Sequence, residues 1–141
     1  MKIQQLSIFV ENKPGRLVEI AETLAGAGVD IRAFSTADTS DFGILRLIVD
    51  RPDAAVDVLR AANLTVMLTE VIAIVIEDKP GSFARVLRIL TDAGVNVEYM
   101  YAFVSRKTDK ANVILRTADT EAAIATLLAN NVCLLTAGDV C

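Results

Sequence analysis

Hydrophobic residues in the first half of the chain recur with two different spacings, one typical of strands and one typical of helices. A period of two predicts strands at residues 6–10, 29–33, 43–49 and 64–68, and a spacing of three and four residues predicts two helices. The two helical stripes are Leu17, Ile20, Ala21 and Leu24, and Ala55, Val58, Leu59 and Ala62. Residues 36–42 are polar and predict a turn. The predicted order is therefore strand, helix, strand, strand, helix, strand.

The second half repeats this order. It predicts strands at residues 72–76, 95–104, 112–117 and 132–135, with a charged turn at residues 105–111. The helical stripes are Phe83, Val86, Leu87 and Leu90, and Ala123, Ile124, Leu127 and Leu128. Only Thr69 and Glu70 separate the halves. We therefore predict an α+β chain of two ferredoxin-like βαββαβ units, residues 1–69 and 70–141, each an antiparallel sheet with both helices on one face.

A strand-to-helix turn introduces the first helix of each half. Val-Glu-Asn-Lys-Pro-Gly-Arg-Leu begins at residue 10 and recurs as Ile-Glu-Asp-Lys-Pro-Gly-Ser-Phe 66 positions later, at residue 76. Pro14 and Pro80 suit the first helical position. Gly15 and Gly81 leave space for a small molecule near the exposed N–H groups of the helix start, which attract anions. The simpler interpretation is an economical turn that is used twice.

Composition excludes several classes of function. The 141 residues include no histidine, which removes histidine-based triads and the commonest metal ligand. Cys133 and Cys141 match no metal-binding spacing, so we expect two free thiols and neither a metal nor a cofactor. A net charge of −4 argues against a nucleic-acid or anionic-membrane partner.

The sequence also predicts location and association. The sequence shows no signal-peptide pattern and no apolar run of the roughly 20 residues that a transmembrane helix needs, so we expect a cytoplasmic protein. Hydrophobic residues make up 53% of the chain, which favours burial of apolar surface between subunits. We therefore expect a homo-oligomer, most simply a dimer.

The repeated residues carry a family resemblance. Each half has an apolar strand, Asn/Asp-Lys-Pro-Gly, an amphipathic helix and Ala-Gly-Val-Asn/Asp-Ile/Val. This pattern resembles the ACT domain over nearly the whole chain, and the arrangement is similar to the small free-standing tandem ACT proteins of bacteria. ACT domains are regulatory modules that bind amino acids, and many are attached to biosynthetic enzymes such as phosphoglycerate dehydrogenase and aspartate kinase. The resemblance implies a non-catalytic, allosteric protein that senses an amino acid and modulates a metabolic enzyme or pathway.

The resemblance also implies a ligand site. In serine-binding ACT domains the ligand lies where two units meet, between the turn of one unit and an Asn at the start of the partner's second strand. The ligand-binding residues implied here are Asn12, Lys13, Pro14, Gly15, Arg16, Leu17, Asp30, Asp78, Lys79, Pro80, Gly81, Ser82, Phe83 and Asn96. Val10 and Ile76 stand where serine-binding domains have a histidine, which argues against serine as the ligand.

Pairing of the two units in that way would make two unequal sites. One would contain Asn12 and Asn96, and the other Asp78 and Asp30. Amides can donate to a carboxylate and accept from an ammonium group, whereas ionised carboxylates only accept. We therefore predict that the Asn12–Asn96 site fills preferentially and that the other site is weak, cation-dependent or empty. Alternatively, the two aspartates only cap and solvate turns.

Other functions compete with the amino-acid sensor. One is an interaction protein whose pocket binds no ligand. An enzyme of the acylphosphatase type would use Arg16, but Ser82 replaces it in the second half. An RNA-binding module needs stacking aromatics, and Tyr99 and Tyr101 have no aromatic counterparts in the first half. A metallochaperone would need a Cys-x-x-Cys motif near the first turn, and the sequence has none there.

Overall fold

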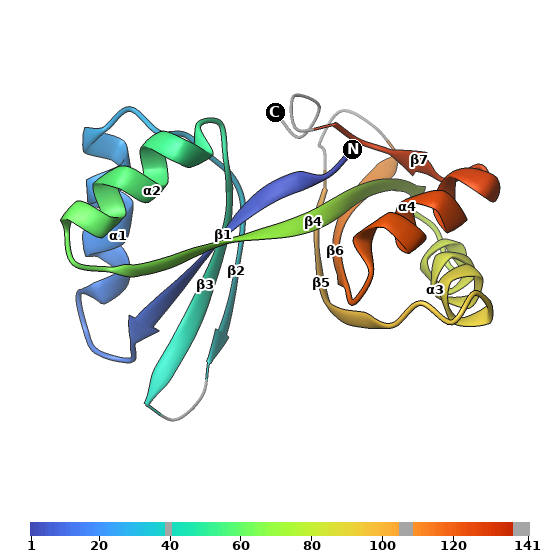
Figure 1. Ribbon diagram of the computed structural model, residues 1–141, viewed down its shortest axis with the longest axis horizontal. Helices are drawn as coiled ribbons and strands as arrows, with labels where there is room; N and C mark the ends of the chain where they lie inside the picture. Colours follow the sequence, from blue (N-terminus) through green and yellow to red (C-terminus); the bar gives the residue numbers. More distant parts are fainter. Residues whose placement is uncertain (39–40, 105–108, 137–141) are drawn as a thin grey trace. The chain divides into compact units, whose positions relative to one another are not determined.

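The order of elements agrees with the predicted double repeat. The computed structural model describes residues 1–38, 41–104 and 109–136 (Figure 1). The elements are β1 (Ile3–Glu11), α1 (Arg16–Gly26), β2 (Ile31–Asp38), β3 (Phe42–Val49), α2 (Pro52–Ala61), β4 (Thr65–Glu77), α3 (Ser82–Asp92), β5 (Val97–Val104), β6 (Lys110–Thr117), α4 (Thr120–Ala129) and β7 (Cys133–Leu134). None of these helices is long and apolar enough to span a membrane.

The chain divides into two compact units, which we describe separately. The N-terminal unit is Gln4–Thr69, and the C-terminal unit contains Met1–Ile3 and the described residues from Glu70 onward. Strand order is β2-β3-β1-β4 in the first and β5-β6-β4-β7 in the second. Within the N-terminal unit, α1 and α2 lie side by side on one face of the sheet (Figure 1). Each unit is therefore ferredoxin-like, as the sequence predicts.

Each unit encloses its own hydrophobic core. In the N-terminal unit, Leu6 and Ile8 of β1 pack with Ile20 and Leu24 of α1 and Leu59 of α2. The equivalent cluster in the C-terminal unit is built by β4, α3, β6 and α4, and comprises Ile72, Ile74, Val86, Leu90, Val113, Leu115, Ala123, Leu127 and Val132. Burial of each large aliphatic side chain contributes roughly 1.5–3 kcal/mol, and it aligns each helix over its sheet.

The stripe predicted for α1 is partly wrong. Ile20 and Leu24 are buried, but Leu17 and Ala21 are exposed. Ala21 follows Ile20 with a rotation of about 100° around the helix, which carries it out of a narrow contact face. Leu17 lies in the first turn beside a cavity and does not join the core cluster. The exposure of Leu17 becomes important for the candidate site.

Several predicted strand boundaries are also wrong. The structure has one strand, β4, where the sequence suggested two strands joined by Thr69 and Glu70; no glycine or proline interrupts it. β2 continues into the predicted turn, because Thr36 pairs with Leu45 across the ladder. β5 and β7 are shorter than predicted. Most of the predicted charged turn, residues 105–108, and residues 39–40 lie outside the described part of the chain.

The helices differ in how their N-terminal ends are capped. Asp119 caps α4, because its carboxylate accepts from the backbone N–H of Ala122 at 3.0 Å. α1 and α3 have no such side-chain cap. The N-terminal ends of α1 and α3 therefore differ from that of α4, and both follow the repeated turn.

Candidate functional site

The repeated turn places a left-handed glycine immediately before α1 and another before α3. Gly15 has φ +86° before α1, and Gly81 has φ +91° before α3. The prolines therefore stand ahead of the cap, and the prediction that Pro14 and Pro80 are the first helical residues is wrong. A residue with φ > 0 is needed at the cap because the chain must reverse between strand and helix, and glycine adopts that conformation at little cost. An added Cβ at either glycine would meet no atom within 4 Å, so the outer side of the turn is open.

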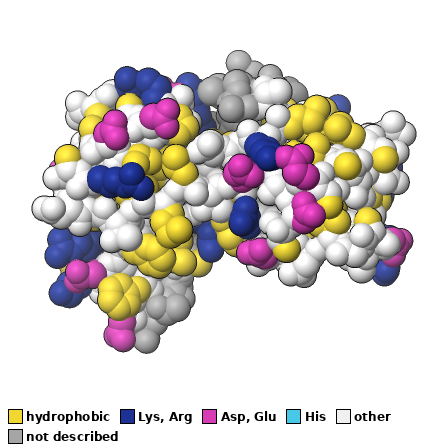
Figure 2. Space-filling model, viewed as in Figure 1, with side chains coloured by type: hydrophobic (Ala, Val, Ile, Leu, Met, Phe, Trp, Pro, Cys, Tyr) yellow, Lys and Arg dark blue, Asp and Glu magenta, His cyan; other side chains and the backbone are white. Residues whose placement is uncertain are grey.

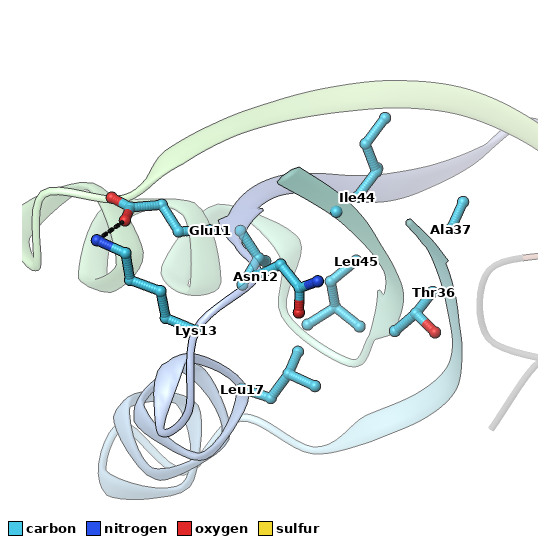
Figure 3. Close-up of a pocket in the computed structure, with 10 residues that line it drawn as sticks. Glu11, Asn12, Lys13, Leu17, Thr36, Ala37, Ile44 and Leu45 are labelled. Atoms are coloured by element: carbon cyan, nitrogen blue, oxygen red, sulfur yellow. Dashed lines mark ion pairs between the residues drawn. The ribbon is translucent and has the colours of Figure 1, made fainter. Parts of the chain in front are cut away.

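A cavity of about 270 Å³ lies beside this turn in the N-terminal unit (Figure 3). It is bounded by the end of β1, the turn, the first turn of α1, and the facing parts of β2 and β3. The lining residues are Val10, Glu11, Asn12, Lys13, Leu17, Thr36, Ala37, Gly43, Ile44 and Leu45. Three residues of the predicted ligand set, Asn12, Lys13 and Leu17, therefore line it.

Polar and apolar side chains converge in this cavity. Figure 3 shows the Asn12 amide lying near Leu45, with Leu17 of α1 below it and Thr36 of β2 opposite. Among the described residues, none forms a hydrogen bond with the side-chain amide of Asn12; its backbone N–H donates to the carbonyl oxygen of Asp41 at 3.1 Å. Within residues 1–38, 41–104 and 109–136 the amide therefore has no competing partner, and the backbone hydrogen bond holds Asn12 in position.

The charged residues of the N-terminal turn form local pairs. Lys13 Nζ lies 2.9 Å from Glu11 Oε2, and this hydrogen bond lowers the pKa of Glu11 below its ordinary value. Arg16 Nη1 lies 3.0 Å from Glu19 Oε2. Arg16 borders a different hollow, of about 310 Å³, between α1 and the segment that leads into β4. The two charged residues that line the cavity beside Asn12, Glu11 and Lys13, therefore neutralise each other.

Asp30 does not line the cavity. Its backbone N–H donates to Asp50 Oδ1 at 2.9 Å, and its carboxylate lies 3.3 Å from Arg32 Nε. The hydrogen bond from Asp30, together with nearby Arg51, lowers the pKa of Asp50. Within the N-terminal unit, Asp30 therefore has a role in connecting the start of β2 to the end of β3.

The C-terminal turn has the same backbone and different side chains. The backbone N–H of Asp78 donates to the carbonyl oxygen of Asp109 at 2.8 Å, and Lys79 Nζ lies 2.6 Å from Glu77 Oε2. Phe83, the counterpart of Leu17, is half-buried and packs against the core cluster of its unit. A carboxylate thus replaces the amide, and a core aromatic replaces the exposed leucine.

A hollow of about 420 Å³ lies on the side of the C-terminal turn that faces β7. Its lining includes four residues of the predicted set, Lys79, Pro80, Gly81 and Ser82. Arg85 and Asn131 also border it, and sequence reasoning missed both. The sequence held a signal for Asn131, because it and Asn63 occupy matching positions before the last strand of each unit. In the structure both residues have positive φ.

Sequence reasoning also missed Thr36 and Leu45. Thr36 lies among polar residues that predicted a turn, and Leu45 was predicted only as part of the strand at residues 43–49. Asn96, at the start of β5, is exposed, and its carbonyl oxygen accepts from the backbone N–H of Ala118 at 3.2 Å. The pairing of Asn12 with Asn96, and of Asp78 with Asp30, stays a prediction.

Solved structures share this fold over the whole chain. A protein from Bacteroides thetaiotaomicron is 41% identical, with a TM-score of 0.94, covering 99% of this chain and 96% of that one. The ligand-free regulatory subunit of aspartate kinase from Thermus thermophilus is 16% identical, with a TM-score of 0.65 and coverage of 91% and 92%. The corresponding subunit from Thermus flavus is 16% identical, with a TM-score of 0.63 and coverage of 89% and 90%.

Among curated proteins, none matches the sequence significantly. The family model of the ACT domain pair matches residues 1–140 of the chain. Both repeats of the turn and all the elements described above fall within that match. The chain therefore belongs to the ACT domain pair family.

Proposed function

We propose that this protein is a non-catalytic regulator that binds a free amino acid in the cavity beside Asn12 and transmits the binding to a metabolic enzyme. The observation that carries the proposal is the convergence of the Asn12 amide and Thr36 with apolar walls at an open glycine turn. An amide and a hydroxyl can each donate to a carboxylate and accept from an ammonium group, which suits a zwitterion.

The similar structures support a regulatory role. Two of them are regulatory subunits of aspartate kinase, and they share the fold of this chain. An enzyme of amino-acid biosynthesis is therefore the class of partner that we propose. Ligand binding would be transmitted to such an enzyme through an interface, because allosteric coupling requires two sites and a difference in affinity between states.

We further propose that the protein works as a homo-oligomer and that Asn96 from a neighbouring unit completes the site at Asn12. Large apolar side chains are exposed on the N-terminal unit, including Phe34 at 71% and Phe42 at 56%. Figure 2 shows hydrophobic side chains at the surface among charged ones. Exposed apolar residues of this size favour burial in an interface.

Titration of the purified chain with the twenty amino acids by calorimetry tests the proposal, with sedimentation as a measure of oligomeric state. We expect saturable binding of at least one amino acid and a species larger than the monomer. An interaction protein without a ligand is the second candidate, and the same exposed apolar residues favour it. Absence of binding by all twenty amino acids would support that candidate and contradict the sensor.

A further inference from the structure

We propose that the ligand is an amino acid with an uncharged aliphatic side chain, and that Leu17 is the residue that selects it. The inference rests on the proposed function, because it specifies the ligand of the same cavity. It follows from three features: the apolar wall, the internal pairing of the nearby charges, and the different residue at the equivalent position of the other unit.

The apolar wall is formed from two elements. Leu17 projects from the first turn of α1 and is 53% exposed, whereas Leu45 of β3 is 8% exposed and already covered on its core side. In Figure 3 the two side chains face each other across the cavity, close to the Asn12 amide. A ligand side chain placed between them would remove apolar surface of Leu17 from water, which is favourable in proportion to the area covered.

The charged residues among those that line the cavity are paired with each other. Glu11 and Lys13 are the charged residues among the described lining residues, and they pair with each other at 2.9 Å. Figure 3 shows this pair directed away from Leu45 and Thr36. A carboxylate or ammonium group carried into the space between Leu17 and Leu45 would lose water without gaining an opposite charge, which is unfavourable. Acidic and basic amino acids should therefore be rejected.

The size of the cavity points to a small ligand. Its volume of about 270 Å³ lies below the roughly 300–1,000 Å³ that is typical of sites for drug-sized molecules. The polar end of the ligand is fixed by Asn12 and Thr36, so the side chain must extend along the leucine wall. Leucine and valine fit this description, and aspartate and lysine are the matched charged comparisons.

The C-terminal unit carries a larger side chain at the position of Leu17. Phe83 occupies the position of Leu17 and packs against the core of its own unit. Replacement of Leu17 by phenylalanine should therefore remove the leucine side chain from the cavity wall, because the aromatic ring can pack toward the core as Phe83 does. Val18 provides a matched control, because it is the next residue on α1, is also 53% exposed, and does not line the cavity.

The experiment is calorimetric titration of the full chain with leucine, valine, aspartate and lysine. For the unsubstituted protein we expect leucine or valine to bind, and aspartate and lysine to bind at least about 100-fold more weakly because their charges are unpaired. Leu17→Phe should weaken leucine binding by at least about tenfold, whereas Val18→Phe should leave it unchanged. Leu17→Asp should reduce the affinity for leucine and raise the affinity for lysine relative to that for leucine. The reason is that the new carboxylate supplies an opposite charge for the lysine ammonium group.

The outcomes separate this inference from the proposed function. Preferential binding of aspartate or lysine, lost in Leu17→Phe, would overturn the inference while leaving an amino-acid sensor in place. Equal losses in Leu17→Phe and Val18→Phe, with unchanged thermal unfolding, would overturn the role of Leu17. Failure of all twenty amino acids to bind the unsubstituted chain would overturn the proposed function and this inference together.

Discussion

In the turn before α1 of the N-terminal unit, the backbone N–H of Asn12 donates to the carbonyl oxygen of Asp41 at 3.1 Å. In the turn before α3 of the C-terminal unit, the backbone N–H of Asp78 makes the corresponding bond to Asp109 at 2.8 Å. Both turns pass through a glycine with φ near +90° and carry a Glu–Lys ion pair. The side chains that face the ligand region are different. The repeat therefore preserves the backbone of the turn and changes the side chains that surround it.

Leu17 and Phe83 make this difference concrete. Leucine at the first helical turn stays exposed and leaves a cavity in front of Leu45, whereas phenylalanine packs against its own core. The amide-to-carboxylate change from Asn12 to Asp78 acts in the same direction, because an ionised carboxylate cannot donate to the carboxylate of an amino acid. We therefore expect the N-terminal unit to carry the binding function.

Core substitutions should have the largest effect and should be equal in the two units. Leu24 of α1 and Leu90 of α3 occupy equivalent positions, and both are fully buried. Leu24→Ala and Leu90→Ala should each cost about 2–5 kcal/mol of unfolding free energy, because each leaves a cavity in a packed core. Urea denaturation measures the loss. A cost below about 1 kcal/mol for either variant would contradict the equivalence of the two cores.

Substitution of the turn glycines should separate structure from binding. Gly15→Val and Gly81→Val should each lower the unfolding free energy by about 1–3 kcal/mol, because a side chain strains a backbone with positive φ even where space is open. Only Gly15→Val should also abolish amino-acid binding. Thermal unfolding and calorimetry on the same samples provide the two measurements. Normal binding by folded Gly15→Val would place the ligand elsewhere.

The second-strand residues test whether a neighbouring unit completes the site. Asn96→Ala should weaken binding by about tenfold or more, as expected for loss of a hydrogen bond to a charged group. Asp30→Ala should change affinity little, because Asp30 interacts with Arg32 and Asp50 of its own unit. Titration of the two variants in parallel decides the point. Equal losses would show that the predicted asymmetry is wrong.

The smallest effect concerns pH, and it should be the same in both units. Hydrogen bonds from Lys13 and Lys79 lower the pKa values of Glu11 and Glu77 from the ordinary 4.5. Each pair therefore stabilises the fold fully above pH 4.5 and loses that contribution as the pH falls through the lowered value. Because both pairs are exposed, the change should be slight and weakened by salt. Melting temperatures of Glu11→Gln and Glu77→Gln between pH 3 and 7 check it, and a large difference between the variants would be unexpected.

The sequence predicted the fold well because the relevant signals are local and occur twice. Alternation in β1, helical spacing in α3 and the glycine turns can each be recognised in a short window. Thr36 was missed since it looks polar and loop-like, and only its pairing with Leu45 across the sheet makes it part of a strand. Leu17 and Phe83 are both apolar residues on a helical stripe, so periodicity could not show that one is exposed and the other packed. The walls of a cavity depend on contacts between distant segments.

The most direct measurement is a calorimetric titration of the intact chain with its preferred amino acid, repeated for Asn12→Ala and Asp78→Ala. Both residues stand at the same position of the repeated turn, so each variant is the control for the other. We predict one site per chain, lost or weakened by at least about tenfold in Asn12→Ala and unchanged in Asp78→Ala. Two equal sites per chain, or an Asp78→Ala variant as impaired as Asn12→Ala, would contradict the assignment of binding to the N-terminal unit.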